Sequence, residues 1–194
     1  IKDKSHNRLT KAKAISIKEA AADTFGIKIA QDAFSFQLKQ LIDRMNFHDK
    51  QIEALDIEIM KYYEQFDCYL HTIPGIGIIG AATILAEIGD ISRFKNSSAL
   101  VAFAGIDPTV RQSGEFNSTH NHMSKRGSPY LRHAIFLAAT TCSFHNSPLN
   151  AYYKKKRDQG KHHLTATGAV ARKLTTVIYA VLRDSKPYEP KKFC

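Results

Sequence analysis

The chain has 194 residues, 43% of them apolar, and a formal net charge of +10 with an isoelectric point near 9.5. It can bury a real core, and its positive charge favours nucleic acid or another polyanion as partner. The three cysteines, Cys68, Cys142 and Cys194, are scattered and lack metal-ligand spacing, which argues against a disulfide framework or a zinc site. No secretory signal pattern opens the sequence, so we expect a soluble, cytoplasmic protein.

The strongest periodic pattern is a long amphipathic helix. Its apolar positions alternate spacings of four and three, and they form a seam of Phe34, Leu38, Leu41, Met45, His48, Ile52, Leu55, Ile59, Tyr62, Phe66 and Tyr69. Charged residues flank this seam, and the run contains neither glycine nor proline. Residues 31–70 therefore predict a coiled coil, between chains or as a hairpin. The alternative is a long helix that packs within its own domain.

Residues 71–90, HTIPGIGIIGAATILAEIGD, combine a proline, close glycines and an apolar run. The uncharged part is shorter than the roughly 20 residues of a membrane span. No Gly-Lys-Ser/Thr follows the glycines, which excludes a Walker loop, and the upstream sequence is helical where a dinucleotide fingerprint needs a strand. Apolar residues at helical offsets on both sides of residues 74–77 predict a helix, a tight turn and a second helix.

Gly75 and Gly77 are the informative residues of this turn. Glycine allows backbone angles closed to other residues, and it removes side chains so that a phosphate can approach. The amides that begin the second helix add the positive end of its dipole. The pattern resembles the helix-hairpin-helix motif, which grips the DNA backbone without reading its sequence. The alternative is a turn that packs two helices and binds nothing.

The remaining residues, 91–194, predict further helices and no run of alternating strands. A short helix follows an N-cap at Ser97 or Ser98 and ends at Gly105. Others begin at Pro129 after a Ser128 cap, at Pro148, and at about Leu164, the last one reaching Asp184. The predicted fold class is mainly α: a long coiled-coil helix followed by a compact helical domain containing a helix-hairpin-helix.

A long polar loop, residues 106–127, interrupts these helices. Connections of this length without secondary structure are uncommon in compact domains unless they have a function. Ser113 lies in the loop between Arg111 and Gly114. A serine nucleophile needs a base or strong electrostatic help, and a phosphodiester target needs cations. From spacing alone a Ser-Gly pair is far more often a turn, so the pattern leaves Ser113 a weak candidate.

Two groups of basic residues suit salt-dependent phosphate contacts. The first flanks the loop and comprises Arg111, Lys125, Arg126 and Arg132. The second is a block on a predicted helix that includes Lys154, Lys155 and Lys156. The alternative for each residue taken singly is a solvated surface position. Arg172 and Lys173, on the last helix, could face either way.

Several ordered motifs across residues 70–190 resemble the C-terminal part of the DEDD-type transposases of bacterial insertion sequences, relatives of the Piv DNA invertase. The matching stretches are IPGIGIIGAATILAEIGDISRF, ALVAFAGIDPTVRQSG, SKRGSPYLRHAIFLAA, YYKKKRDQGK, AVARKL and KPYEP. Residues 31–70 resemble the coiled-coil region of that family. Residues 1–30 resemble the helical tail of a preceding RuvC-like domain, and residues 91–194 the C-terminal transposase domain.

The resemblance implies a chemistry. In this family a RuvC-like domain carries acidic residues that bind a divalent metal such as Mg, and the C-terminal domain carries an essential serine in the motif G-h-x-P-x-x-x-x-S-G. Gly105, Ile106, Pro108, Ser113 and Gly114 match that motif, so the resemblance assigns the serine role to Ser113. It implies DNA strand exchange through a covalent serine–DNA linkage, completed by the acidic domain of a partner subunit. Some members are also guided by an RNA.

We expect this chain to be a C-terminal portion without the RuvC-like domain. Such a portion would bind DNA and form a homo-oligomer through the coiled coil, but it would not recombine DNA alone and would hold no metal or other cofactor. Two alternatives stay open on the sequence: a non-enzymatic helix-hairpin-helix DNA-binding module, and a coiled-coil assembly protein whose basic surface is incidental.

Overall fold

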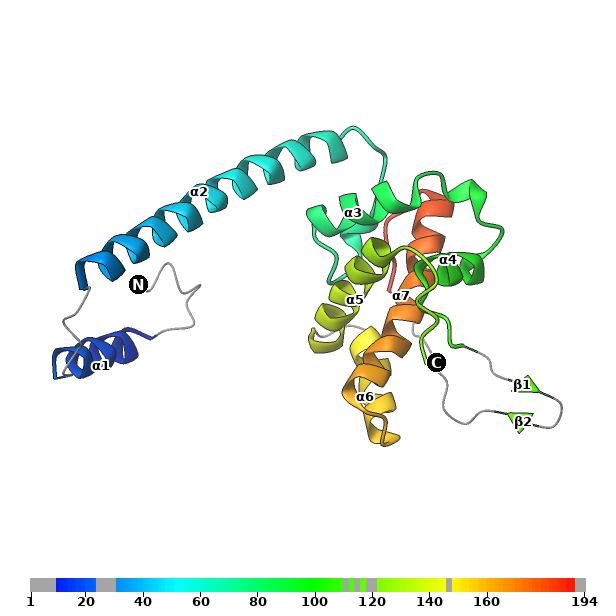
Figure 1. Cartoon of the computed structure of the whole chain (residues 1–194). Helices are drawn as coiled ribbons and strands as arrows, with labels where there is room; N and C mark the ends of the chain where they lie inside the picture. The colour runs from blue at the N-terminus through cyan, green and yellow to red at the C-terminus, as the bar shows by residue number, and fades with distance from the viewer. Residues whose placement is uncertain are drawn as a thin grey trace. The chain divides into compact units, whose positions relative to one another are not determined.

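The computed structural model describes residues 10–23, 31–109, 112–113, 116–117, 122–145 and 148–190 (Figure 1). The expectation of a mainly α fold is confirmed. The α-helices are α1 (Lys11–Ala22), α2 (Gln31–Tyr63), α3 (Ile78–Ile88), α4 (Ser97–Ala104), α5 (Pro129–Phe144), α6 (Pro148–Asp158) and α7 (His163–Asp184). Single 3₁₀ turns are η2 (Leu70–Thr72) and η3 (Ile91–Arg93), and two short strands are β1 (Gln112–Ser113) and β2 (Phe116–Asn117).

The chain divides into two compact units, Ile1–Ile52 and Glu53–Cys194. The first holds α1 and most of α2. The N-cap residue of α1 is Thr10, whose hydroxyl oxygen accepts the N–H of Lys13 at 3.3 Å. In neither α1 nor the part of α2 up to Ile52 is any residue buried. None of the helices in the described ranges is long and apolar enough to cross a membrane.

The predicted seam of α2 is exposed along the helix. Its exposed members, between 49% and 67% accessible, are Phe34, Leu38, Leu41, Met45, Ile52, Leu55 and Tyr62. A long helix with an uncovered apolar stripe differs from one packed within its own domain, because such a stripe is normally buried against a partner. The coiled coil itself stays a prediction.

The predicted apolar seam extends beyond the end of the observed helix. The helix ends at Tyr63, so Phe66 and Tyr69 lie beyond its last residue. The Tyr63 side chain is buried, and its hydroxyl donates to the backbone carbonyl of Cys68 at 3.0 Å. Burial of Tyr63 together with Leu70 pulls the following segment into the core and turns the chain away from the helix axis.

The core of the second unit forms around α7. This helix packs against α4, α5 and α6, and α3 packs against α5 (Figure 1). Leu174 and Ile178 of α7 are fully buried. The C-terminal segment returns to the same core, where the backbone N–H of Tyr188 donates to the hydroxyl of Thr72 at 2.8 Å. The glycine turn and the serine loop are therefore both attached to one helical body.

The helix ends follow local rules, with one correction. Gly105 ends α4 in the left-handed conformation, as predicted, and the Ser128 hydroxyl accepts the N–H of Leu131 at the start of α5 at 3.1 Å. The cap of α4 was placed wrongly. Its N-cap is Asn96, whose side-chain oxygen accepts the N–H of Ala99 at 2.9 Å. An asparagine caps as well as a serine does, so the helix begins one or two residues earlier than predicted.

Candidate nucleic-acid interface

The serine arm, residues 106–127, is paired at its base. The backbone N–H of Thr109 donates to the carbonyl of His122 at 2.7 Å, and that of Ser124 donates to the carbonyl of Asp107 at 2.8 Å. Between them Pro108 and Met123 form an antiparallel bridge. The expected structureless connection is therefore wrong for this part, because the two extended segments satisfy each other's backbone groups.

The arm carries Ser113 in a short pair of antiparallel strands. Strand β1 pairs with β2 antiparallel, with Gln112 opposite Asn117 and Ser113 opposite Phe116. Sequence reasoning did not predict these strands, because two-residue strands leave no alternating pattern. Ser113 is the last residue of β1. Arg111 and Gly114 lie outside the described residues.

The base of the arm is fixed between the end of α4 and the start of α5. The backbone N–H of Ser128 donates to the carbonyl of Phe103 at 2.9 Å. Gly127 passes so close that a β-carbon built on it would lie 1.7 Å from the oxygen of Phe103 and 2.9 Å from the nitrogen of Gly105. The guanidinium of Arg132 donates to the carbonyl of Ala104 at 3.3 Å. Only a glycine allows the two chain segments this approach.

A hollow of about 640 Å³, which we call the basic groove, lies along this base. Its walls come from the arm, from α5 and from the first half of α7. They are formed by Ile106, Pro108, His122, Met123, Lys125, Pro129, Arg132, His133, Phe136, Leu164, Thr165, Gly168 and Arg172. Among the residues that the structure describes, the wall contains three cations and two histidines but no carboxylate, so a polyanion suits it.

Some of the groove residues were predicted from the sequence as nucleic-acid-binding. Lys125 and Arg132 were predicted, whereas His122 and His133 were missed, and the orientation of Arg172 was left open. Within each helix the groove residues share one face, which helical spacing could have shown: Arg132 and Phe136 are four apart on α5. Which face of α7 meets which face of α5 depends on contacts distant in sequence.

Lys125 holds an unusual backbone conformation. Its φ is 54°, in the left-handed region that favours glycine. Its N–H donates to the carbonyl of Gly105 at 3.0 Å, which helps to hold the chain there. Lys125, Arg132 and Arg172 form no salt bridge with any carboxylate whose position the structure gives. The next residue, Arg126, is exposed and does not line the groove.

The second predicted basic group lies on α6, apart from the groove. Lys154 and Lys155 are exposed, whereas Lys156 is half-buried. The Lys156 ammonium donates to the side chain of Gln159 at 3.3 Å and lies 5.4 Å from the centre of the Tyr152 ring. None of the three lysines lines the basic groove. The structure therefore presents two basic surfaces.

The two glycines of the 74–77 turn have different environments. Gly75 has φ +88° and faces α5, where an added β-carbon would lie 2.7 Å from the sulfur of Cys142 and 3.0 Å from the carbonyl of Ala138. The Cys142 thiol donates to the carbonyl of Pro74 at 2.6 Å, and burial raises the pKa of this thiol to about 11. Packing against α5 therefore explains the glycine at position 75, whether or not a phosphate binds there.

Gly77 is the glycine with open space. It is the exposed N-cap of α3, and no atom lies within 4 Å of an added β-carbon. Its φ of −79° and ψ of 172° are open to any residue, so the expectation of a glycine-only backbone is correct for Gly75 and wrong for Gly77. The first helix of the predicted pair is also only the 3₁₀ turn η2. A phosphate contact at this turn stays a prediction.

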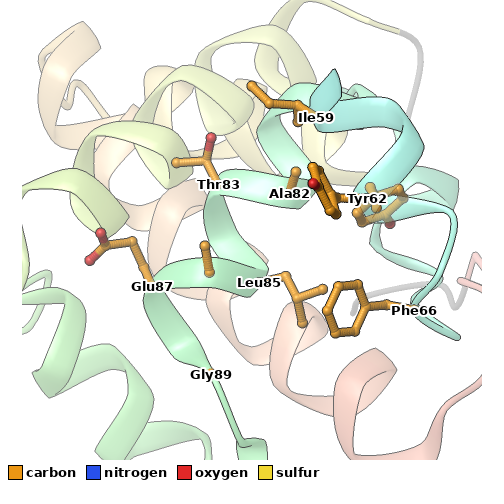
Figure 2. Close-up of a pocket in the computed structure, with 10 residues that line it drawn as sticks. Ile59, Tyr62, Phe66, Ala82, Thr83, Leu85, Glu87 and Gly89 are labelled. Carbon is orange, nitrogen blue, oxygen red and sulfur yellow. The ribbon is translucent and has the colours of Figure 1, made fainter. Parts of the chain in front are cut away.

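A second pocket, of about 650 Å³, is apolar rather than basic. It lies between the end of α2 and α3, and Figure 2 shows Phe66 beside Leu85 and Tyr62 beside Ala82. Its wall contains one carboxylate, Glu87, and no basic residue. The Glu87 carboxylate accepts the hydroxyl of Ser128 at 2.6 Å, so it helps to fix the start of α5. This hollow does not suit a polyanion.

The described residues also do not fit a metal site. Among them, no group of three or more His, Cys, Asp or Glu residues is placed to hold a metal ion. Cys68 and Cys142 are buried and form no disulfide within the described residues, and Cys194 lies outside those ranges.

Comparison with known proteins finds a family model that matches part of this chain. Residues 67–154 match the model of the Transposase IS116/IS110/IS902 family, and this range contains the glycine turn, the serine arm and α5. The chain is 35% identical over 145 residues to the insertion element IS110 uncharacterized 43.6 kDa protein of Streptomyces coelicolor, covering 73% of this chain and 35% of that protein.

Two further relatives are similar at the same level. The chain is 31% identical over 172 residues to the pilin gene-inverting protein of Moraxella bovis, covering 83% of this chain and 52% of that protein. It is 32% identical over 151 residues to the insertion element IS900 uncharacterized 42 kDa protein of Mycobacterium paratuberculosis, covering 73% of this chain and 38% of that protein. The chain therefore spans about a third to a half of the length of these relatives.

The close contact at the base of the arm predicts the effect of one methyl group. Gly127→Ala should lower the free energy of unfolding by about 3 kcal/mol or more, because the backbone of Phe103 cannot move aside without opening the arm. The control is Gly80→Ala within α3, whose β-carbon would meet its nearest atom at 3.9 Å. It should stabilise the chain by about 0.5–1 kcal/mol, the helix preference of alanine. Urea unfolding of both variants checks this, and equal stability would contradict the described contact.

The glycine turn gives a second prediction. Gly75→Ala should cost about 2–3 kcal/mol of stability, because it adds both a clash with Cys142 and an unfavourable φ. Gly77→Ala should cost no more than about 1 kcal/mol, the difference between glycine and alanine as a cap. If a phosphate approaches Gly77, the same variant should weaken binding to a labelled DNA duplex several-fold. Unchanged duplex affinity of a folded Gly77→Ala chain would favour a turn that only packs helices.

Proposed function

We propose that this chain, whose residues 67–154 form a domain of the Transposase IS116/IS110/IS902 family, is the DNA-binding and serine-bearing part of a transposase or recombinase. The observation that carries the proposal is the serine arm, which bears Ser113 and is fixed at its base beside a groove whose cations form no salt bridge among the described residues. The relatives support it by their names, since they are insertion-element proteins and a pilin gene-inverting protein.

The proposed chemistry is a transesterification at a DNA phosphodiester. The Ser113 oxygen bonds to phosphorus, the bond from phosphorus to one sugar oxygen breaks, and the serine proton passes to a base while the leaving oxygen gains a proton. The DNA is then held as a serine phosphodiester, and a hydroxyl of the receiving strand displaces the serine in the reverse sense. Each step replaces one phosphodiester bond with another, so strands can be exchanged without a high-energy cofactor.

The cations of the arm and α5 have a defined part in this scheme. A phosphodiester under attack gains negative charge on its free oxygens, and fixed cations lower the cost of that charge. Lys125 and Arg132 are the candidates within the groove, with Arg126 beside them on the surface. The base that activates Ser113 and the divalent metal (Mg) belong, in this proposal, to an acidic RuvC-like domain of the complete protein.

The remaining surfaces are proposed to hold the DNA. Lys154, Lys155 and Lys156 of α6 would contact backbone phosphates, and Gly77 would allow one to reach the start of α3. A guide RNA, which some members of the family use, would meet the same basic surfaces. A helix-hairpin-helix module without chemistry would account for the turn and the charge, but it would leave the serine arm unexplained.

We also propose that the chain forms a homo-oligomer through α2. The exposed seam has the spacing of a coiled coil, and covering it with a second copy removes apolar surface from water. Oligomerisation would allow one subunit to complete the site of another.

The covalent step has a direct test. The complete protein is incubated with a divalent metal, any guide RNA and a labelled target duplex, then denatured, and DNA attached to protein is measured. We expect an adduct that maps to Ser113 and disappears in Ser113→Ala, while duplex binding stays within about twofold, because a single hydroxyl contributes little to a contact with many phosphates. Ser98→Ala, an exposed serine of α4, is the control. DNA cut and joined equally well by Ser113→Ala would exclude this mechanism.

The seam has its own test. Leu41→Glu should convert an oligomeric chain to a monomer, because it places a charge within the apolar contact. Gln51→Glu, which adds the same charge to α2 outside the seam, should leave the oligomer intact. Light scattering after size-exclusion chromatography gives the mass, and circular dichroism checks that helix content is retained. A wild-type chain that is already monomeric at micromolar concentration would contradict the proposal.

A further inference from the structure

We propose that the basic groove holds one unpaired nucleotide of a nucleic-acid strand, with its phosphate against the cations and its base on an apolar floor. This inference rests on the proposed function, since the strand concerned is one that is handled at the serine arm. It goes further by assigning a ligand class to the groove and roles to Arg172 and Leu164, which the family resemblance does not supply.

The cations converge on the groove from three different elements. Lys125 comes from the arm, Arg132 from α5 and Arg172 from α7. Arg132 is half-buried, and its bond to the carbonyl of Ala104 fixes the guanidinium at the wall. A single phosphate placed among these side chains would therefore join the arm to both helices.

The starts of two long helices add to the positive potential. Pro129 is the first residue of α5, and Thr165 is the third residue of α7, and both line the groove. The first-turn N–H groups of a helix carry its positive dipole end. Acidic residues are few between positions 85 and 183: Glu87, Asp90, Asp107, Glu115 and Asp158. Glu87 accepts the Ser128 hydroxyl at the start of α5 and does not line the groove. Of these, Asp107 accepts a hydrogen bond from the Ser124 hydroxyl and is not part of the groove wall.

The rest of the wall is apolar, and this feature decides the class of ligand. It is formed by Ile106, Pro108, Met123, Pro129, Phe136 and Leu164. The phosphates on a DNA duplex need cations but no apolar floor, whereas a base that leaves its stack exposes a flat apolar face. Cations beside aromatic and aliphatic side chains are the combination that proteins use to hold single strands.

The size of the groove agrees with a single nucleotide. Its volume of about 640 Å³ falls in the range of small-molecule pockets, roughly 300–1,000 Å³. A duplex is too wide to enter such a hollow and could only lie across it. Leu164, in the first turn of α7, is 60% exposed at the groove, so a bound base would cover apolar surface that water now contacts.

The test compares oligonucleotides that differ in one feature. The chain is titrated with a fluorescent blunt DNA duplex, and with the same duplex extended by a short 3′ or 5′ single strand. We expect the extended duplex to bind at least fivefold more tightly, since stacking of one base contributes about that much or more. The same pair is made with an RNA extension. Tighter binding of the DNA extension identifies the target strand as the source of the nucleotide, and tighter binding of the RNA extension identifies a guide.

Two variants assign the contacts. Leu164→Ser should remove most of the preference for the extended duplex and leave blunt-duplex affinity unchanged. Its control is Leu137→Ser, which changes a leucine of α5 that is 57% exposed and outside the groove. Arg172→Gln should weaken binding of the extension and lower the salt slope by about 0.7, the value for one single-strand phosphate. Arg183→Gln, on the same helix but about 16 Å further along, should do neither.

The outcomes separate this inference from the proposed function. Equal affinity for blunt and extended duplexes, or equal effects of Leu164→Ser and Leu137→Ser in folded chains, would overturn the nucleotide site. A Ser113 adduct would still form in that case, and the proposed function would stand. If the extension is preferred and no adduct forms, the groove is a single-strand site on a protein without the proposed chemistry.

Discussion

The contact between Gly127 and the carbonyl end of α4 is the constraint on which the candidate site depends. Two backbone segments touch there without a side chain between them, and the N–H of Ser128 donates to the carbonyl of Phe103 across the contact. This fixes where the serine arm leaves the helical body and where α5 begins. The groove exists because the arm leaves at that point and returns beside α7. A small change at this contact would therefore move the arm, α5 and the groove together.

Local features of the fold could be predicted from sequence, and long-range ones could not. The pair Ser128 and Pro129 predicts a helix start, and Gly105 predicts a helix end. Both signals are local, because each residue affects only the backbone within a few positions of it. Gly75 needs its positive φ as expected. That it faces α5, where Cys142 lies, could not be read from the turn, since this depends on residues more than 60 positions away.

The same limit applies to the candidate site. The basic residues around the serine loop stood out by composition, and the block on α6 did so even more strongly. Only the structure separates them, placing Lys125 and Arg132 in a groove and leaving the α6 lysines on another surface. Arg172 illustrates the reason, because it joins Arg132 through the packing of α5 on α7. Charge alone favours nucleic acid as a partner, whereas the proposal of a single-strand site depends on cations placed beside an apolar floor.

The left-handed backbone at Lys125 has a consequence for which residue suits this position. A φ of 54° costs a lysine about 1–2 kcal/mol that glycine avoids, and asparagine tolerates the conformation better than most residues. If only this backbone conformation mattered, glycine or asparagine would be favoured at position 125. A lysine at this position therefore costs stability, which a contact made by its ammonium group would have to offset. If the proposed contact were removed, glycine or asparagine at position 125 would give the more stable chain.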